Sequence, residues 1–234
     1  MPEFDALRVE QALHLLAQSG HAMPPGAPGS AAWMQGLIDG LCELSSRDAL
    51  TGLANRRSFE SALGREIDRV ARSGEPALLL LLDIDHFKRV NDTHGHAVGD
   101  LVIQSVADGL RETVRPMDLA ARIGGEEFAV ILPNCSPAFG QTVADRLRSR
   151  IEARPIPIGP SQTLGVTISV GGAYAPQWVR STASLWTERA DLQLYRAKAE
   201  GRNRTCLEPT PVSVVSPEEK GLLFGTSNFG EFLE

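Results

Sequence analysis

A continuous apolar run that ends in two acids limits the folds open to this chain more than any other feature. Residues 77–82 are the longest purely apolar stretch of the sequence, and Asp83-Ile84-Asp85 follows directly. Such a run predicts a strand covered on both faces, as found at the centre of an α/β sheet. Because an unpaired buried charge is costly, the two carboxylates at its end also mark a candidate functional site.

Helical and strand patterns alternate around this run. The apolar spacing predicts helices at 55–72, 98–114, 136–154 and 184–200, and strands at 77–84, 119–123, 128–132 and 163–173. The two strands between 119 and 132 flank Gly124-Gly125, a pair typical of a hairpin turn. The order α-β-α-β-β-α-β-α predicts an α/β protein with a mixed central sheet flanked by helices.

The two ends of the chain differ from this central region, which we expect to form one domain over residues 46–206. Residues 1–45 are predicted to be an N-terminal helical segment, with helices at 4–19 and 31–44 joined by a linker rich in proline and glycine. The second helix fits a helix packed on the domain and a dimerising stalk equally well, because it has apolar residues at coiled-coil spacing. These residues are Met34, Leu37, Leu41 and Leu44. Residues 207–234 are predicted to be an acidic and apolar tail that docks on its own domain or on a partner.

Composition excludes several classes of protein. A net charge of -6 argues against a nucleic-acid-binding protein, so a local basic cluster or a metal ion would have to hold any anionic ligand. The apolar stretches are too short for a membrane span, and the N-terminus lacks the pattern of a signal peptide. Three scattered cysteines argue against a disulfide framework and a structural zinc site. We therefore expect a soluble cytoplasmic protein.

Carboxylates recur in the predicted hairpin, where Glu126 and Glu127 follow the glycine pair. We call residues 124–127 the acidic turn. Because side chains alternate along a strand, only one of the two glutamates can join Asp83. Clustered carboxylates favour Mg²⁺, which prefers hard oxygen ligands. The alternatives are a solvated hairpin tip and, for Asp83 and Asp85, helix capping or pairing with neighbouring basic residues.

Two further segments have the chemistry needed to bind a nucleotide. Asn91 and Asp100 carry donor and acceptor groups that match a guanine edge. Lys198 and Arg202 lie one helical turn apart and could hold phosphates, although a solvated basic helix end also explains them. Three histidines lie nearby, but they lack the helical spacing of a zinc hydrolase, and no Walker phosphate loop occurs.

In their order along the chain, these motifs resemble the GGDEF family of diguanylate cyclases over about residues 46–206. Each motif is weak by itself, whereas five in order are highly specific. Gln193 is a small departure, because the family usually has alanine there. The resembling segments are an opening signature at 48–57, a substrate segment at 83–100, Gly124-Gly125-Glu126-Glu127-Phe128 with glutamate as the first acid, 167–171, and 190–203.

The resemblance implies a fold like the palm of nucleotidyl cyclases and polymerases, with a ferredoxin-like core. It implies condensation of two GTP molecules into cyclic di-GMP, with release of two pyrophosphates. Two Mg²⁺ ions per active site, with Mn²⁺ as an alternative, would be held by Asp83, the carbonyl of Ile84 and Glu126. Lys88 would stabilise the transition state, and Glu126 or Glu127 would take the proton. The residues implied to bind GTP are Phe87, Lys88, Asn91, Asp92, His96, Asp100, Lys198 and Arg202.

The resemblance also implies a homodimer, because each subunit of the family binds a single GTP. The N-terminal helices are the expected contact region, and they or the tail are the expected site for any protein partner. A non-catalytic sensor of GTP or cyclic di-GMP is the main alternative, but such modules normally lose Asp83, Glu126 or Glu127. A nucleic-acid polymerase would need a longer chain with basic groove-forming domains.

A separate motif resembles the inhibitory product site of the family. Arg115 and Asp118 form an Arg-x-x-Asp pattern, and five residues separate it from Gly124. Arginine can hold phosphate and stack on guanine, and Arg146 is a candidate for a second basic group. The motif precedes the strand that leads into the acidic turn, so we expect it across the domain from the catalytic residues. A surface turn with a local ion pair is the alternative.

Overall fold

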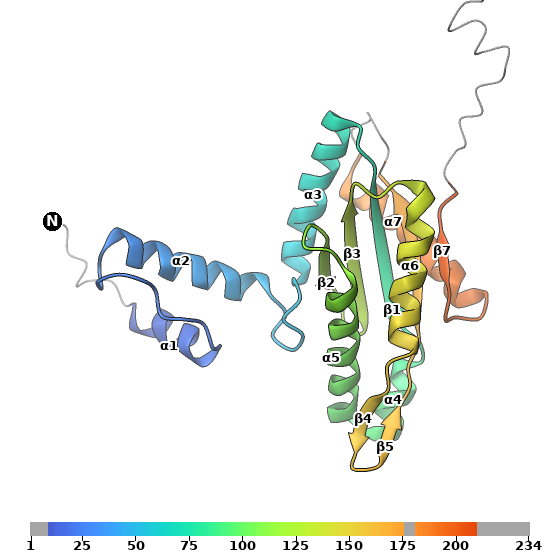
Figure 1. Ribbon diagram of the computed structural model, residues 1–234, viewed down its shortest axis with the longest axis horizontal. Helices are drawn as coiled ribbons and strands as arrows, with labels where there is room; N and C mark the ends of the chain where they lie inside the picture. The colour runs from blue at the N-terminus through green and yellow to red at the C-terminus, as the bar shows by residue number, and fades with distance from the viewer. Residues whose placement is uncertain (1–8, 176–180, 210–234) are drawn as a thin grey trace, which may run out of the picture.

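The computed structural model describes residues 9–175 and 181–209, and Figure 1 shows how the elements are arranged. The helices are α1 (Glu10–Gln18), α2 (Ala31–Ser46), α3 (Arg56–Ser73), α4 (Phe87–His94), α5 (His96–Thr113), α6 (Pro137–Glu152) and α7 (Ala183–Ala199). The strands are β1 (Ala77–Ile84), β2 (Leu119–Arg122), β3 (Glu127–Pro133), β4 (Ile156–Gly159), β5 (Gln162–Leu164), β6 (Ile168–Tyr174) and β7 (Thr205–Leu207).

The central sheet has the strand order β2-β3-β1-β6-β7. Strand β1 is antiparallel to both β3 and β6, while β7 joins the edge parallel to β6. The segments β1-α5-β2-β3-α6-β6 follow the β-α-β-β-α-β order of a ferredoxin-like core. The predicted mixed sheet flanked by helices and the predicted ferredoxin-like core are therefore confirmed.

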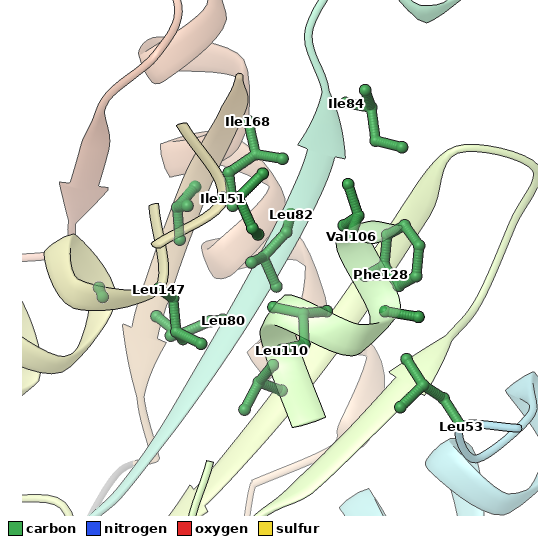
Figure 2. Packing of buried hydrophobic residues seen from close by; sticks show 14 of the residues in the cluster. Leu53, Leu80, Leu82, Ile84, Val106, Leu110, Phe128, Leu147, Ile151 and Ile168 are labelled. Atoms are coloured by element: carbon green, nitrogen blue, oxygen red, sulfur yellow. The ribbon is translucent and has the colours of Figure 1, made fainter. Parts of the chain in front are cut away.

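Strand β1 lies at the centre of the hydrophobic core, and all eight of its residues are buried. Its side chains point alternately to the two faces of the sheet and belong to two hydrophobic clusters. One cluster lies under α5 and α6, and the other lies under α3 and α7. Figure 2 shows the first cluster, in which Leu80 and Leu82 of β1 pack with Leu110 of α5 and Leu147 of α6. The apolar run thus predicts correctly a strand that is covered on both faces.

Three short elements add to those predicted from the sequence. Helix α4 and strands β4 and β7 are only three to eight residues long, so they carry little periodic signal. The strand predicted at 163–173 is interrupted, because residues 165–167 separate β5, which pairs with β4 in a second sheet, from β6 of the central sheet. Thr167 instead donates its hydroxyl to Asp85.

Helices α1 and α2 form a separate N-terminal hairpin that projects from the sheet domain in Figure 1. Its core is its own cluster around Leu16, Trp33 and Leu37, which contains no residue of the sheet. Gly40 of α2 lies directly under Leu16, since a Cβ there would approach Leu16 Cδ2 to 2.8 Å. Helix α1 therefore packs on α2, where Met34, Leu41 and Leu44 are only partly buried.

The C-terminal end of the described chain belongs to the sheet. Strand β7 ends at Leu207, and the backbone N–H of Glu208 donates to the carbonyl of Gly172. Glu208 also pairs with Arg189 of α7. Most of the predicted tail, from residue 210 on, lies outside the described residues. No helix among the described residues has the length and hydropathy needed to cross a membrane.

Candidate active site

The last residues of β1 place a buried carboxylate beside a lysine. Asp83 is 7% exposed, and its Oδ2 lies 2.7 Å from the Nζ of Lys198, near the end of α7. Burial raises the pKa of Asp83 above its ordinary value, and the charge of Asp85 adds to this effect. The ion pair with Lys198 and the charge of Arg202 oppose that rise without cancelling it. The surroundings of Asp83 therefore disfavour its ionised form, mainly because the carboxylate is buried.

The acidic turn brings one of its two glutamates toward Asp83. Burial, and then the charge of Asp83, raises the pKa of Glu126. The carboxylate of Glu127 instead lies against Gly124 of the turn. A Cβ on Gly124 would come within 2.2 Å of Glu127 Oε2. The two glutamates thus have different surroundings: the charges of Asp83 and Lys198 act on Glu126, and Glu127 lies opposite Asp83 in the pairing of β3 with β1.

Helix α4 begins directly after this acidic cluster. His86, at its N-cap, has φ 58° and gives no side-chain cap, so the first amides of the helix are not capped by that residue. Phe87 is buried in the core, so it could contact a phosphate only through its backbone, whereas Lys88 is exposed. Because free N–H groups and the helix dipole favour anions, this N-terminus suits a phosphate group.

Asn91 lies one turn further along α4, against the start of α5. Its Oδ1 is buried and has no hydrogen-bond partner among the described residues. Gly99 of α5 leaves the space that this amide occupies, because a Cβ there would lie 2.0 Å from Asn91 Oδ1. Buried polar groups normally have hydrogen-bond partners, so this amide is suited to hydrogen bonding with a bound ligand.

The remaining predicted ligand residues lie on the surface around these two helices. Asp92 is exposed on α4, and His96 and Asp100 are exposed in the first two turns of α5. Arg202 is exposed just beyond α7, and its charge acts on Asp83. The structure therefore groups Asp83, Glu126, Lys198 and Arg202, and it places Asn91 on the adjoining helix.

The donor set around Asp83 fits a hard divalent cation such as Mg²⁺ better than Zn²⁺. Asp83, Glu126 and the backbone of Ile84 offer only oxygen atoms, which hard cations prefer. No group of three or more histidine, cysteine, aspartate or glutamate side chains suited to a metal occurs in residues 9–175 and 181–209. Water or phosphate oxygens would have to complete the coordination, as is usual for Mg²⁺.

Comparison with known proteins identifies the family. The family model described as "Diguanylate cyclase, GGDEF domain" matches residues 45–204. The chain belongs to the GGDEF family. Response regulator PleD of Caulobacter vibrioides is 40% identical over 172 residues, which cover 73% of this chain and 38% of PleD. The chain spans less than half the length of the curated relatives that it matches.

Two solved structures include the region before the GGDEF domain. The coiled coil and GGDEF domain of DgcB from Caulobacter crescentus, in complex with c-di-GMP, has a TM-score of 0.70 at 29% identity. The match covers 86% of this chain and all of the DgcB chain. Diguanylate cyclase SiaD from Pseudomonas aeruginosa, in complex with its activator SiaC, also has a TM-score of 0.70, at 34% identity. That match covers 86% of this chain and 72% of SiaD.

Arg122 is a residue of the GGDEF domain that was not predicted from the sequence. Its Nη1 lies 3.3 Å from both carboxylate oxygens of Asp48, and its Nη2 donates to the carbonyl of Gly125 at 2.9 Å. Burial opposes ionisation of Asp48, but bonds from Thr51 and the charge of Arg122 outweigh burial and lower its pKa. Arg122 therefore ties the opening segment to the acidic turn. The only sequence signal was an arginine placed two residues before the glycine pair.

The Arg-x-x-Asp motif lies at the other end of the GGDEF domain. Nε and Nη2 of Arg115 donate to the two carboxylate oxygens of Asp118 at 3.2 and 2.9 Å. Arg115 also donates to the carbonyl of Pro133, the last residue of β3. Since Glu127 begins the same strand, the motif lies about 20 Å from the acidic turn at roughly 3.4 Å per residue.

Arg146 of α6 lies at this same end of the domain. Its Nη2 donates at 3.3 Å to the carbonyl of Thr113, two residues before Arg115. The side chain of Arg115 is about half-exposed, while that of Asp118 is only 2% exposed. The ion pair is thus preformed, and its arginine can still contact a ligand.

Proposed function

We propose that this chain is a diguanylate cyclase, which condenses two GTP molecules into cyclic di-GMP and releases two pyrophosphates. The proposal rests on the convergence of Asp83 and Glu126 beside Lys198, where the central strand leads into α4. Membership of the GGDEF family supports it, as does the complex of DgcB with c-di-GMP.

In this reaction the 3′-hydroxyl of one GTP attacks the α-phosphate of the other. A new P–O bond forms while the bond to pyrophosphate breaks, and a second transfer closes the ring. Because phosphoryl transfer depends on positioning and on stabilising negative charge, the basic groups around the site have the main role. Lys88, Lys198, Arg202 and the backbone of Phe87 would hold the phosphates. The hydroxyl proton goes to Glu126 or Glu127, and both are candidates.

The acidic pair would hold the metal ions of this reaction. Asp83 and Glu126 both have a raised pKa, which shows that their negative charge is unfavourable in this partly buried site. A cation bound there would relieve that cost. Two Mg²⁺ ions, with Mn²⁺ as an alternative, would activate the hydroxyl and neutralise the leaving pyrophosphate.

Guanine selection would depend on the residues near the α4–α5 junction. Asn91 has a buried and unpartnered Oδ1, and Asp100 lies exposed on the next helix. An amide and a carboxylate together match the donors and acceptors of the guanine edge. Asp92 and His96 flank this region and would complete the contacts to GTP.

We further propose that the enzyme acts as a homodimer, because a site that binds one GTP needs a second site opposite. The N-terminal hairpin is the proposed contact region, since it projects from the domain and has its own core. A protein partner could also bind there, as SiaD has been solved with its activator SiaC. Turnover per subunit should then rise with protein concentration in the range where the dimer assembles.

Product inhibition would act through the distant arginine site. Arg115, Asp118 and Arg146 offer two guanidinium groups and one carboxylate at the end of the domain away from Asp83. Cyclic di-GMP bound there could link two domains and keep their GTP sites apart. Such coupling between sites is typically worth about 1–3 kcal/mol.

The decisive experiment incubates the purified chain with GTP and Mg²⁺ and detects the dinucleotide product by mass spectrometry. Glu126→Gln keeps the side-chain shape but removes the charge, so it should lower turnover at least about 100-fold. Glu60→Gln is the matched control, because Glu60 is an exposed residue of α3 outside the site. It should leave turnover within twofold.

Two outcomes would contradict the proposal. Wild-type turnover by Glu126→Gln would show that this carboxylate does not serve catalysis. GTP binding without any dinucleotide product, at protein concentrations where a dimer is observed, would instead indicate a non-catalytic sensor.

A further inference from the structure

Asp85 differs from Asp83 in its surroundings, although only one residue separates them. Asp85 is 6% exposed, and both of its carboxylate oxygens accept hydrogen bonds. The hydroxyl of Ser169 donates to Oδ1 at 2.6 Å, and the hydroxyl of Thr167 donates to Oδ2 at 2.7 Å. The backbone N–H of Asn203 also donates to Oδ2, at 3.0 Å. These bonds account for the burial of this carboxylate without a metal ion.

The partners of Asp85 come from two segments that are distant in sequence. Ser169 lies at the start of β6 and Thr167 directly precedes the strand, while Asn203 lies between α7 and β7. The backbone N–H of Asp85 donates in addition to the carbonyl of Thr167 at 2.9 Å. Asp85 therefore joins the end of β1 to the start of β6 and to residues 201–204, which we call the 201–204 turn.

The 201–204 turn has an unusual backbone that its surroundings must hold. Arg202 has φ 64° and Asn203 has φ 45°, and neither is a glycine. Non-glycine residues in the left-handed region are strained, and they persist where neighbouring groups fix them. The side chain of Asn203 is fixed from α6, because it accepts from Arg148 at 2.8 Å and donates to Glu152 at 2.7 Å. Its backbone is fixed by Asp85.

Two cations act on the acidic cluster: Arg202 belongs to the 201–204 turn, and Lys198 precedes the turn in α7. Lys198 contacts Asp83 directly from the last turn of α7, and the charge of Arg202 also acts on Asp83. The backbone N–H of Arg202 donates to the carbonyl of Ala197 at 3.0 Å, which joins the turn to the end of α7. A shift of the turn would therefore displace Arg202 first, and then the end of the helix that carries Lys198.

We infer that Asp85 is a positioning residue that holds the 201–204 turn, so that Arg202 faces the phosphates bound beside Asp83. This inference rests on the proposed function, which assigns phosphate binding to Arg202. A carboxylate suits the role because it offers two acceptor oxygens to three donors. An asparagine of the same shape offers one acceptor oxygen, and its NH₂ group would face a donor.

The first test measures hydrogen exchange in the nucleotide-free protein. Asp85→Asn should increase exchange of the backbone amides of residues 201–204 about tenfold or more, because the bond from the Asn203 N–H weakens. Thr167→Val is a milder second variant that removes one donor to Asp85 and should act in the same direction. Unchanged exchange of the turn in both variants would overturn the inference, whether or not the chain is a cyclase.

The second test measures the Kd of α,β-methylene GTP in the presence of Mg²⁺. Asp85→Asn should raise this Kd about tenfold, as the loss of a residue that orients a ligand-binding group commonly does. In an Arg202→Ala background the same substitution should change the Kd less than twofold, because the group it positions is gone. An equal fold-change in both backgrounds would refute action through Arg202.

A matched control separates positioning from general stability. Trp186→Phe removes a buried hydrogen bond of 2.8 Å between α7 and the carbonyl of Ala173, far along the helix from the turn. It should lower the Tm and leave the Kd within twofold. A rise in Kd equal to that of Asp85→Asn would show that instability alone explains the effect. Failure of the wild-type chain to bind the analogue would count against the proposed function, and the exchange measurement would then decide the role of Asp85.

Discussion

Gly99→Ala should weaken recognition of guanine while the fold is retained. A Cβ at position 99 would lie 2.0 Å from Oδ1 and 3.1 Å from Cγ of Asn91. An ordinary contact begins at 3.4 Å, so the amide oxygen has to move by about 1.4 Å, the difference between these two distances. A displacement of that size breaks the alignment of any hydrogen bond that Asn91 makes to the base.

The magnitude follows from the loss of hydrogen bonds between Asn91 and guanine. A polar group left unpaired in a binding site costs about 1–3 kcal/mol. At about 1.4 kcal/mol per factor of ten, the KM for GTP should rise about 5- to 150-fold. Position 99 is inside α5, where alanine is favoured over glycine by roughly 1 kcal/mol. This gain helps to offset the strain of the displaced side chain.

Steady-state kinetics with GTP and with ATP, together with a thermal melt, test this prediction. The preference for GTP over ATP should fall by about the same factor as the KM for GTP rises. Gly64→Ala is the matched control, because a Cβ at position 64 of α3 would meet nothing within 4 Å. The control should raise the Tm and leave the KM unchanged. A KM within twofold of wild type for a folded Gly99→Ala protein would refute the assignment of Asn91 to the base.

Three further predictions concern other parts of the chain. Burial and the charge of Asp83 raise the pKa of Glu126 above 4.5, so its ionisation costs stability as pH rises through that raised pKa. Glu126→Gln should therefore raise the Tm at pH 7 without divalent cations, with no gain in acid below pH ~4; a lower Tm at pH 7 would contradict this. Arg115→Ala should abolish inhibition by added cyclic di-GMP and lower the Tm, because the buried Asp118 loses its partner; inhibition as strong as in wild type would place the product elsewhere. Leu16→Ala should cost the N-terminal hairpin about 2–5 kcal/mol, so hydrogen exchange should increase in α1 and α2 but not in β1; equal protection of α1 in both proteins would disprove the separate core.

The central part of the fold could be predicted from the sequence because its requirements are local. A strand that is buried on both faces needs a continuous apolar run, and residues 77–82 of β1 supply it. The longer helices have enough turns for their apolar spacing to be visible. The family resemblance rests likewise on motifs of consecutive residues, such as the glycine pair and the two glutamates of the acidic turn.

The short elements could not be predicted, because tertiary contacts define them. Helix α4 has only eight residues and no side-chain N-cap, so it lacks both usual signals of a helix start. Strand β7 has three residues and exists by pairing with β6, which lies more than thirty residues earlier in the chain. Arg122 likewise obtains its role from Asp48, which comes from a distant segment.

The two aspartates at the end of β1 show most clearly what the sequence determines and what the tertiary structure determines. The sequence by itself determined that two carboxylates follow a buried strand and therefore need partners. From the sequence, Asp83 and Asp85 were equivalent candidates for metal ligands. The tertiary structure separates them, because Lys198 and Glu126 approach Asp83 while the start of β6 and the 201–204 turn close over Asp85. A buried charge is satisfied by the groups that folding brings to it, and those that bind Asp85 come from segments more than eighty residues away along the chain.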